Sequence, residues 1–137
     1  MGAWGVEPFD NDDAADWAAE FDGVDAALGV EVLRRALNVQ DSYVESNDGS
    51  AAVAAAQVVA WLVEPLTMVE SSYCEAAVSW VRRHAPAADP VLVADARRAL
   101  GRVRGSDSEL AELWADADDD AWRETLDRID TVLTSAN

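Results

Sequence analysis

Cysteine, histidine and lysine are scarce in this sequence, and their scarcity excludes several kinds of site. Cys74 is the only cysteine and His84 the only histidine among 137 residues, and lysine does not occur. A single cysteine excludes an internal disulfide bond and leaves no cysteine framework for zinc. A di-iron bundle needs a glutamate three residues before each histidine, but Val81 occupies that position. We therefore expect no metal and no cofactor.

Positive charge is also scarce. Ten arginines face 27 acidic residues, which gives a formal net charge of −17 and an isoelectric point near 4.1. Nucleic acids and anionic membranes both attract basic surfaces, so we expect neither as a partner. Residues 1–25 lack the positive start of a secretory signal. The most apolar segment, residues 51–63, is shorter than the about 20 residues that span a bilayer. These features predict a cytoplasmic protein.

The residues that are abundant favour helices. Half of the sequence is hydrophobic, alanine is frequent, and strand signals are nearly absent. We predict an all-α fold, a compact single-domain bundle of six or seven helices over residues 1–137, with an irregular N-terminal lead-in. The expected helices span about residues 10–21, 25–38, 50–63, 70–84 and 90–104, then a short one opened by a capping box at Ser106 and Glu109, and a last one that begins near residues 118–120.

Apolar periodicity also predicts which residues form the core. The helix over residues 50–63 is apolar on almost every side, so we expect it to be the central one. Five of the six tryptophans lie on helical stripes and are expected in the core, namely Trp17, Trp61, Trp80, Trp114 and Trp122. Tyr43 and Tyr73 are expected to face inward, and Glu124 and Arg128 to form an i,i+4 ion pair.

The charges are unevenly distributed along the chain. Residues 1–25 and 106–137 are strongly acidic, whereas residues 82–104 contain six arginines and only two acidic residues, Asp89 and Asp95. Two interpretations stay open. The charged residues are ordinary solvated helix faces, or one acidic end docks on the arginine-rich stretch through carboxylate–guanidinium pairs.

Both ends of the chain carry a recognisable pattern. The segments Met1–Gly5, Phe9–Asp12 and Ala15–Trp17 together resemble the opening of the mainly bacterial family called domain of unknown function 4259. Further positions similar to that family follow in the C-terminal half: Ser108, Glu109, Leu110, Leu113, Trp114, Trp122, Leu126 and Leu133. The resemblance implies a stand-alone helical protein. It implies no activity, ligand or catalytic residue.

Three arrangements of side chains resemble sites that carry chemistry in other proteins. Asp116, Asp118 and Asp120 alternate as in a calcium loop, but Ala121 replaces the required glycine, which favours an acidic helix start. Cys74 and His84 are ten residues apart, which places them on different faces of a helix. At the N-terminus, Trp4 and Phe9 can fill grooves between helices and Asp10 or Asn11 can cap a helix. Alternatively, Asp10, Asp12, Asp13 and Asp16 gather around a cation or a basic partner.

These observations favour a protein without catalytic residues. The preferred function is a non-enzymatic, strongly acidic interaction or regulatory module, either immunity-like or a regulator of a basic protein. The candidate interaction residues are Asp10, Asp12, Asp13, Asp16, Arg97, Arg98 and Arg102. The alternative is a small-ligand-binding protein or enzyme with an Arg/Trp-lined pocket between helices, in which Arg97, Arg98, Arg102 and Arg104 receive an anionic ligand.

Overall fold

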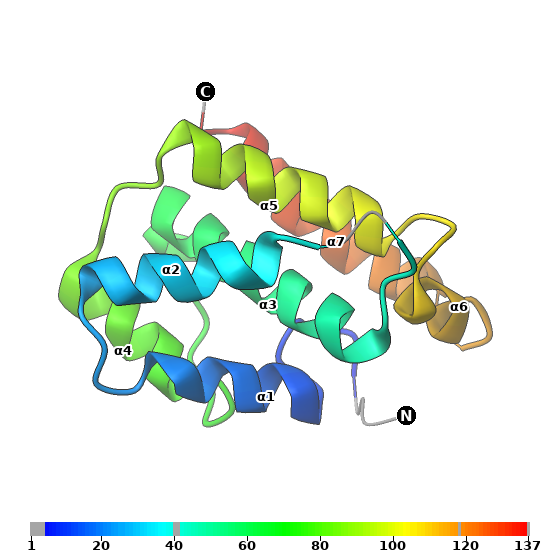
Figure 1. Ribbon diagram of the computed structural model, residues 1–137, viewed down its shortest axis with the longest axis horizontal. Coiled ribbons are helices and arrows are strands. Elements are labelled where there is room, and N and C mark those ends of the chain that lie inside the picture. Colours follow the sequence, from blue (N-terminus) through cyan, green and yellow to red (C-terminus); the bar gives the residue numbers. More distant parts are fainter. Residues whose placement is uncertain (1–4, 40–41, 118, 137) are drawn as a thin grey trace.

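The secondary structure is helical throughout the part of the chain that is described. The structure, a computed structural model, describes residues 5–39, 42–117 and 119–136 and has no β-strand within them. Seven α-helices and two short 3₁₀ turns confirm the predicted all-α bundle (Figure 1). They are α1 (Asp12–Ala18), η1 (Ala19–Phe21), α2 (Ala26–Leu37), α3 (Ser46–Val63), η2 (Pro65–Thr67), α4 (Glu75–His84), α5 (Pro90–Val103), α6 (Glu109–Ala115) and α7 (Asp119–Thr134).

Side-chain caps explain where four of these helices begin. Asn11, Asp25 and Asp89 each accept a hydrogen bond from a backbone N–H three residues later, at 2.8 Å, and open α1, α2 and α5. Ser108 caps α6 through the N–H of Ala111 at 3.3 Å, so the predicted cap at Ser106 is wrong by two residues. Such caps satisfy backbone donors that a helix start leaves without partners.

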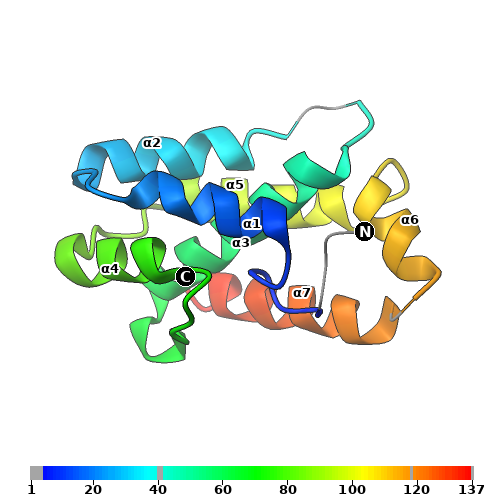
Figure 2. The same cartoon turned by 90° about the horizontal axis from the view of Figure 1, so that it is seen from below.

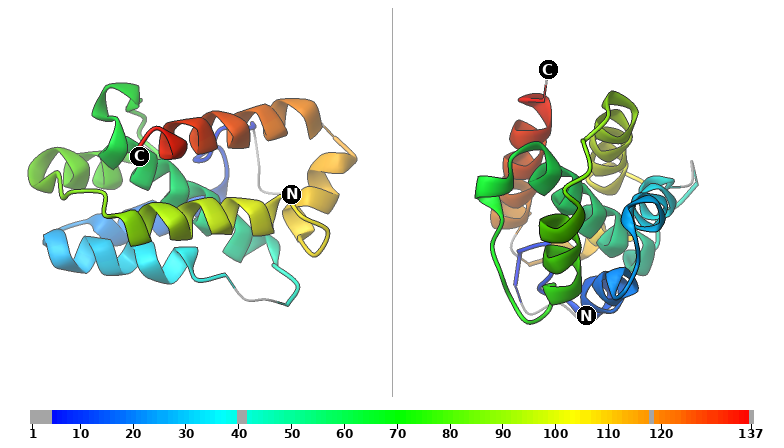
Figure 3. Two further views of the ribbon diagram at one scale, coloured as in Figure 1. Left: turned by 90° about the horizontal axis from the view of Figure 1, so that it is seen from above. Right: turned by 90° about the vertical axis from the view of Figure 1, so that its left-hand side faces the viewer.

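Helix α3 is the centre of the fold, as its all-round apolar sequence predicts. It contacts all six other α-helices, and the end-on view in Figure 3 shows it surrounded by them. Most of its side chains from Ala52 to Trp61 are buried, many of them alanines with no exposed surface. Small side chains allow several helices to approach one axis closely, which explains the alanine content of this segment.

Helix α3 begins earlier than the sequence predicts, at Ser46 rather than Ser50. The cause lies in a distant part of the chain: the Glu109 carboxylate accepts a hydrogen bond from the Ser46 N–H at 2.7 Å. Gly49 lies in this first turn, where a Cβ atom would be 3.0 Å from the Leu110 side chain, so a larger residue would require that side chain to shift. Residues 46–49, whose sequence is typical of a turn, therefore form the first turn of α3, and a tertiary contact with Glu109 stabilises it.

Helix α4 begins later than predicted, at Glu75 rather than near residue 70. No side chain caps it, and residues 68–74 are irregular. The buried position just before the helix belongs to Cys74, whereas the neighbouring Tyr73 is exposed. The prediction that Tyr73 faces inward is therefore wrong.

The tryptophan predictions are confirmed where the structure describes them. Trp17, Trp61, Trp80, Trp114 and Trp122 are all buried, and each packs on another aromatic ring. Phe9 stacks on Trp61 with ring centroids 5.7 Å apart, so it fills an interhelical groove as expected. Trp4 lies outside the described residues.

Tyr43 is exposed, and the prediction that it faces inward is wrong; its neighbour Val44 takes the buried position. The Val44 backbone pairs with the start of α6 through the N–H of Glu109 and the carbonyl of Asp107. This pairing turns the Tyr43 side chain toward solvent, where its hydroxyl donates a hydrogen bond to Glu112 at 2.6 Å.

The contact between Tyr43 and Glu112 leads to a pH prediction. The carboxylate accepts the phenol proton and repels a phenolate, which raises the pKa of Tyr43 from 10.0 to about 12. The neutral phenol is the form that folding favours, so this contact stabilises fully below pH 10 and is lost as the pH rises toward 12. Replacing Glu112 with glutamine should bring the pKa of Tyr43 back toward 10.0. The tyrosinate absorbance during an alkaline titration measures it, and an unchanged curve contradicts it.

The ion pairs favour the second interpretation of the charge pattern. Arg97 contacts Asp130 at 3.0 Å and Arg104 contacts Asp127 at 2.7 Å, so acidic α7 docks on the arginine-rich face of α5. Arg128 pairs with Glu7 at 2.7 Å; the predicted pair with Glu124 is wrong, because the N-terminal segment supplies a carboxylate in better reach. Exposed pairs contribute about 0–1 kcal/mol each, so they orient α7 rather than hold it.

Candidate functional site

The candidate arginines are occupied within the chain. Arg97 pairs with Asp130, Arg98 pairs with Asp95 at 3.2 Å, and Arg102 donates to the Ser42 carbonyl at 2.7 Å. None of the three lines either cavity beside the N-terminal segment. Arg97 therefore connects α5 with α7, Arg98 pairs within α5 and Arg102 bonds the loop before α3, so the three are not gathered around a shared anion site.

The four N-terminal aspartates do not converge on one point either. Asp10 accepts a hydrogen bond from the backbone N–H of Glu7 at 3.2 Å and so closes a turn, while Asn11 caps α1. Asp12, Asp13 and Asp16 are exposed on α1. Among the described residues, no group of three or more potential ligands is placed to hold a metal ion. Asp118 of the acidic turn lies outside the described residues.

The N-terminal segment, residues 5–11, separates two cavities. Glu7 and Pro8 line both of them, and Figure 2 shows this segment in dark blue between α1 and α7. One cavity, of about 310 Å³, lies toward α6, and we call it the carboxylate cavity. The other, of about 390 Å³, lies toward η2 and Cys74, and we call it the thiol cavity.

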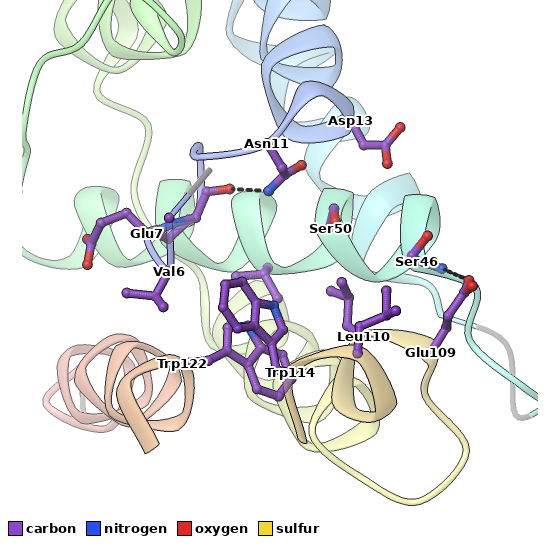
Figure 4. Close-up of a pocket in the computed structure, with 14 residues that line it drawn as sticks. Val6, Glu7, Asn11, Asp13, Ser46, Ser50, Glu109, Leu110, Trp114 and Trp122 are labelled. Carbon is purple, nitrogen blue, oxygen red and sulfur yellow. Dashed lines mark hydrogen bonds between the residues drawn. The ribbon is translucent and has the colours of Figure 1, made fainter. Parts of the chain in front are cut away.

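The carboxylate cavity is built from four separate stretches of chain (Figure 4). Its apolar wall contains Trp114 and Trp122, which are stacked with centroids 6.2 Å apart and an interplanar angle of 12°. The polar groups lie on the N-terminal segment, α1, the first turns of α3 and the start of α6. The lining residues are Gly5, Val6, Glu7, Pro8, Asn11, Asp13, Ser46, Ser50, Val53, Glu109, Leu110, Leu113, Trp114 and Trp122.

The carboxylate cavity has a negative lining. Glu7, Asp13 and Glu109 contribute carboxylates, and no arginine or histidine is among its lining residues. Glu7 is paired with Arg128, and Glu109 accepts the Ser46 N–H. Asp13 makes no hydrogen bond or ion pair within the described chain. Asp13 is therefore an uncommitted carboxylate at a cavity whose described lining residues include no arginine or histidine.

Ser50 adds a second uncommitted group. It lies in α3, is 5 % exposed, and lines the carboxylate cavity. Its hydroxyl makes no hydrogen bond to any described residue, and its oxygen keeps some accessible surface. Figure 4 places it between Asn11 and Asp13 on one side and the two indoles on the other. A ligand with hydrogen-bond donors would satisfy both this oxygen and Asp13.

The thiol cavity offers less chemistry. Phe9, Trp61 and Ile129 form apolar parts of its lining, and Arg128 at its edge is already paired with Glu7. Cys74 is 2 % exposed, and its thiol lies 3.7–3.9 Å from backbone and hydroxyl oxygens of Val69 and Ser71. His84 lies at the other end of α4, about 15 Å away along a helix. Cys74 and His84 therefore do not form a nucleophile–base pair.

Sequence reasoning identified Asp13 but missed the cavity it faces. Ser50 was interpreted as a helix start, Glu109 as half of a local cap, and Trp114 as core. Ser50 and Trp114 are 64 positions apart in the sequence, and they meet only because α6 folds over the start of α3. The sequence feature that indicates a site here is the polarity of residues 46–50, at the N-terminal end of an otherwise apolar helix.

None of the described helices combines the length and apolar character needed to cross a bilayer. No curated protein and no solved structure matches the chain. The model of one family matches residues 2–125, which include the segment between the cavities and every described lining residue of the carboxylate cavity. The chain therefore belongs to the family described as domain of unknown function (DUF4259).

Proposed function

We propose that this protein is a non-enzymatic, acidic interaction or regulatory module that binds a basic protein partner. The observation that carries the proposal is that most of the arginines are paired within the chain. Eight of the ten form ion pairs with carboxylates of the same chain, and Arg102 bonds a backbone carbonyl. Most arginines are therefore paired within the chain, and the excess carboxylates remain available to a binding partner.

An unbalanced surface of this kind has a physical consequence for association. Summed carboxylates produce a negative potential that attracts a basic protein and speeds its encounter, and the effect weakens with salt. The same field repels nucleic acids and anionic lipids. A basic toxin or a basic regulator of nucleic acids fits this surface, which corresponds to an immunity-like or regulatory role.

The experiment is recovery and reconstitution of the partner. Tagged protein is purified from its native cells at low salt, and the stoichiometric co-eluting protein is identified, produced and titrated back. We expect a partner with an isoelectric point above about 9 and a dissociation constant that rises steeply with salt. A neutral or acidic partner, or binding that salt does not weaken, contradicts the proposal.

The second candidate function is a small-ligand-binding protein, and the two tryptophan-lined cavities favour it. The arginines expected to receive an anionic ligand lie elsewhere, and Arg128 of the thiol cavity is paired with Glu7. An anion would have to break that pair. The charge of the carboxylate cavity instead suits a positive group, which is also what a basic partner supplies.

A further inference from the structure

We propose that the carboxylate cavity binds an arginine side chain of the basic partner. This inference rests on the proposed function and specifies where on the acidic surface recognition takes place. Three independent features of the cavity support it: its charge, its unsatisfied acceptors and its aromatic wall.

The charge and the acceptors match a guanidinium group. Among the lining groups without a partner in the described chain are Asp13 and the Ser50 hydroxyl. They are acceptors, and they lie on the same side of the cavity as Asn11 in Figure 4. Guanidinium presents five N–H donors in a plane and has no acceptor, so it can bond a carboxylate and a neighbouring hydroxyl together.

The aromatic wall suits the same group. Trp114 and Trp122 form a stacked pair at the cavity, and guanidinium favours contact with indole rings. Trp122 already shows this interaction within the chain, because the Arg123 guanidinium carbon lies 5.9 Å from its ring centroid. Val6, Val53 and Leu110 provide apolar surface for the methylene stem of the arginine.

The volume is compatible with one long side chain. At about 310 Å³ the carboxylate cavity is at the lower end of the about 300–1,000 Å³ that ligand sites occupy. It opens beside exposed α1, where Asp12 and Asp16 lie on the surface.

The test compares nona-arginine and nona-lysine as probes at low salt, on the full chain and three variants, by isothermal titration. We expect the wild-type chain to prefer nona-arginine. Asp13→Asn should weaken nona-arginine binding about fivefold and reduce the preference, since an exposed charge pair is worth up to about 1 kcal/mol. Asp12→Asn is the matched control, because Asp12 is adjacent, exposed and in the same first turn but does not line the cavity. It should change binding less than twofold.

Ser50→Ala separates binding from folding. The hydroxyl makes no hydrogen bond in the described chain and alanine favours helices, so the midpoint of urea unfolding should not fall. Nona-arginine binding should nevertheless weaken about fivefold, because the acceptor is lost. Lower stability with unchanged binding would mean that the hydroxyl is structural, and would overturn its role here.

The outcomes separate this inference from the proposed function. If nona-arginine binds in a salt-dependent way but Asp13→Asn and Ser50→Ala bind it as tightly as the wild type, the cavity is not the site and the acidic module stands. Equal binding of nona-arginine and nona-lysine by the wild-type chain overturns guanidinium recognition. If neither peptide binds at low salt, the proposed function fails together with the inference.

Discussion

Replacing Gly29 with alanine is expected to destabilise the protein by about 3 kcal/mol, although alanine is the better helix former. Gly29 is buried in α2, and a Cβ atom there would lie 2.1–2.3 Å from three atoms of the Trp80 indole. Trp80 has little room to yield, because its Nε1 donates to the Asp25 carbonyl at 2.9 Å and its ring packs on Phe21. Urea unfolding followed by circular dichroism measures the change.

Gly101 provides the matched control. It lies in helix α5, is exposed, and a Cβ atom there would meet nothing within 4 Å. Gly101→Ala should therefore stabilise the protein by about 0.5–1 kcal/mol. The same change from glycine to alanine is thus expected to raise the free energy of unfolding at one helical site and to lower it at the other. If Gly29→Ala is as stable as the wild type, the close approach of α2 to the Trp80 side chain of α4 is wrong.

Replacing Ala55 with leucine should cost about 2–3 kcal/mol. Ala55 is fully buried in α3, where the surrounding helices pack closely enough that three added carbon atoms have no space. Ala94→Leu is the control, because Ala94 is exposed on α5 and substitutions at such sites usually change stability by less than about 0.5 kcal/mol. Thermal or urea unfolding of both variants tests whether α3 is the central helix; equal stability would contradict it.

Most of the helical framework could be predicted from local signals. Asp25 and Asp89 are capping residues directly before amphipathic segments, and both caps occur in the structure. The tryptophans occur on helical stripes, and those that the structure describes are buried. Burial of one face is the main determinant of such a bundle, and periodicity reports it directly.

Three of the errors concern residues whose partners are distant in sequence. Residues 46–49 form a helix because Glu109 accepts the Ser46 N–H, and no local pattern reveals that partner. Arg128 pairs with Glu7 instead of Glu124 for the same reason. Tyr43 turns outward because the backbone of Val44 pairs with the start of α6. Each error exchanges a local interaction for a tertiary one.

The candidate site could be predicted only in part. The sequence identified acidic α1 and the arginine-rich stretch as the charged regions, and it left open whether they serve partners or one another. The structure shows Arg97 and Arg104 bonded to α7. It also shows one of the four aspartates, Asp13, at a cavity formed with Ser50 and Trp114. A cavity depends on the packing of separate helices, which neither composition nor spacing encodes.

The most direct test of the account is a nuclear magnetic resonance titration of the isotope-labelled chain with nona-arginine at low salt. We expect the indole N–H signals of Trp114 and Trp122 to shift, because both line the carboxylate cavity. The signal of Trp80, whose N–H is bonded to the Asp25 carbonyl away from that cavity, should stay in place. An unchanged spectrum, or shifts that spare Trp114 and Trp122, would contradict cation binding at this site.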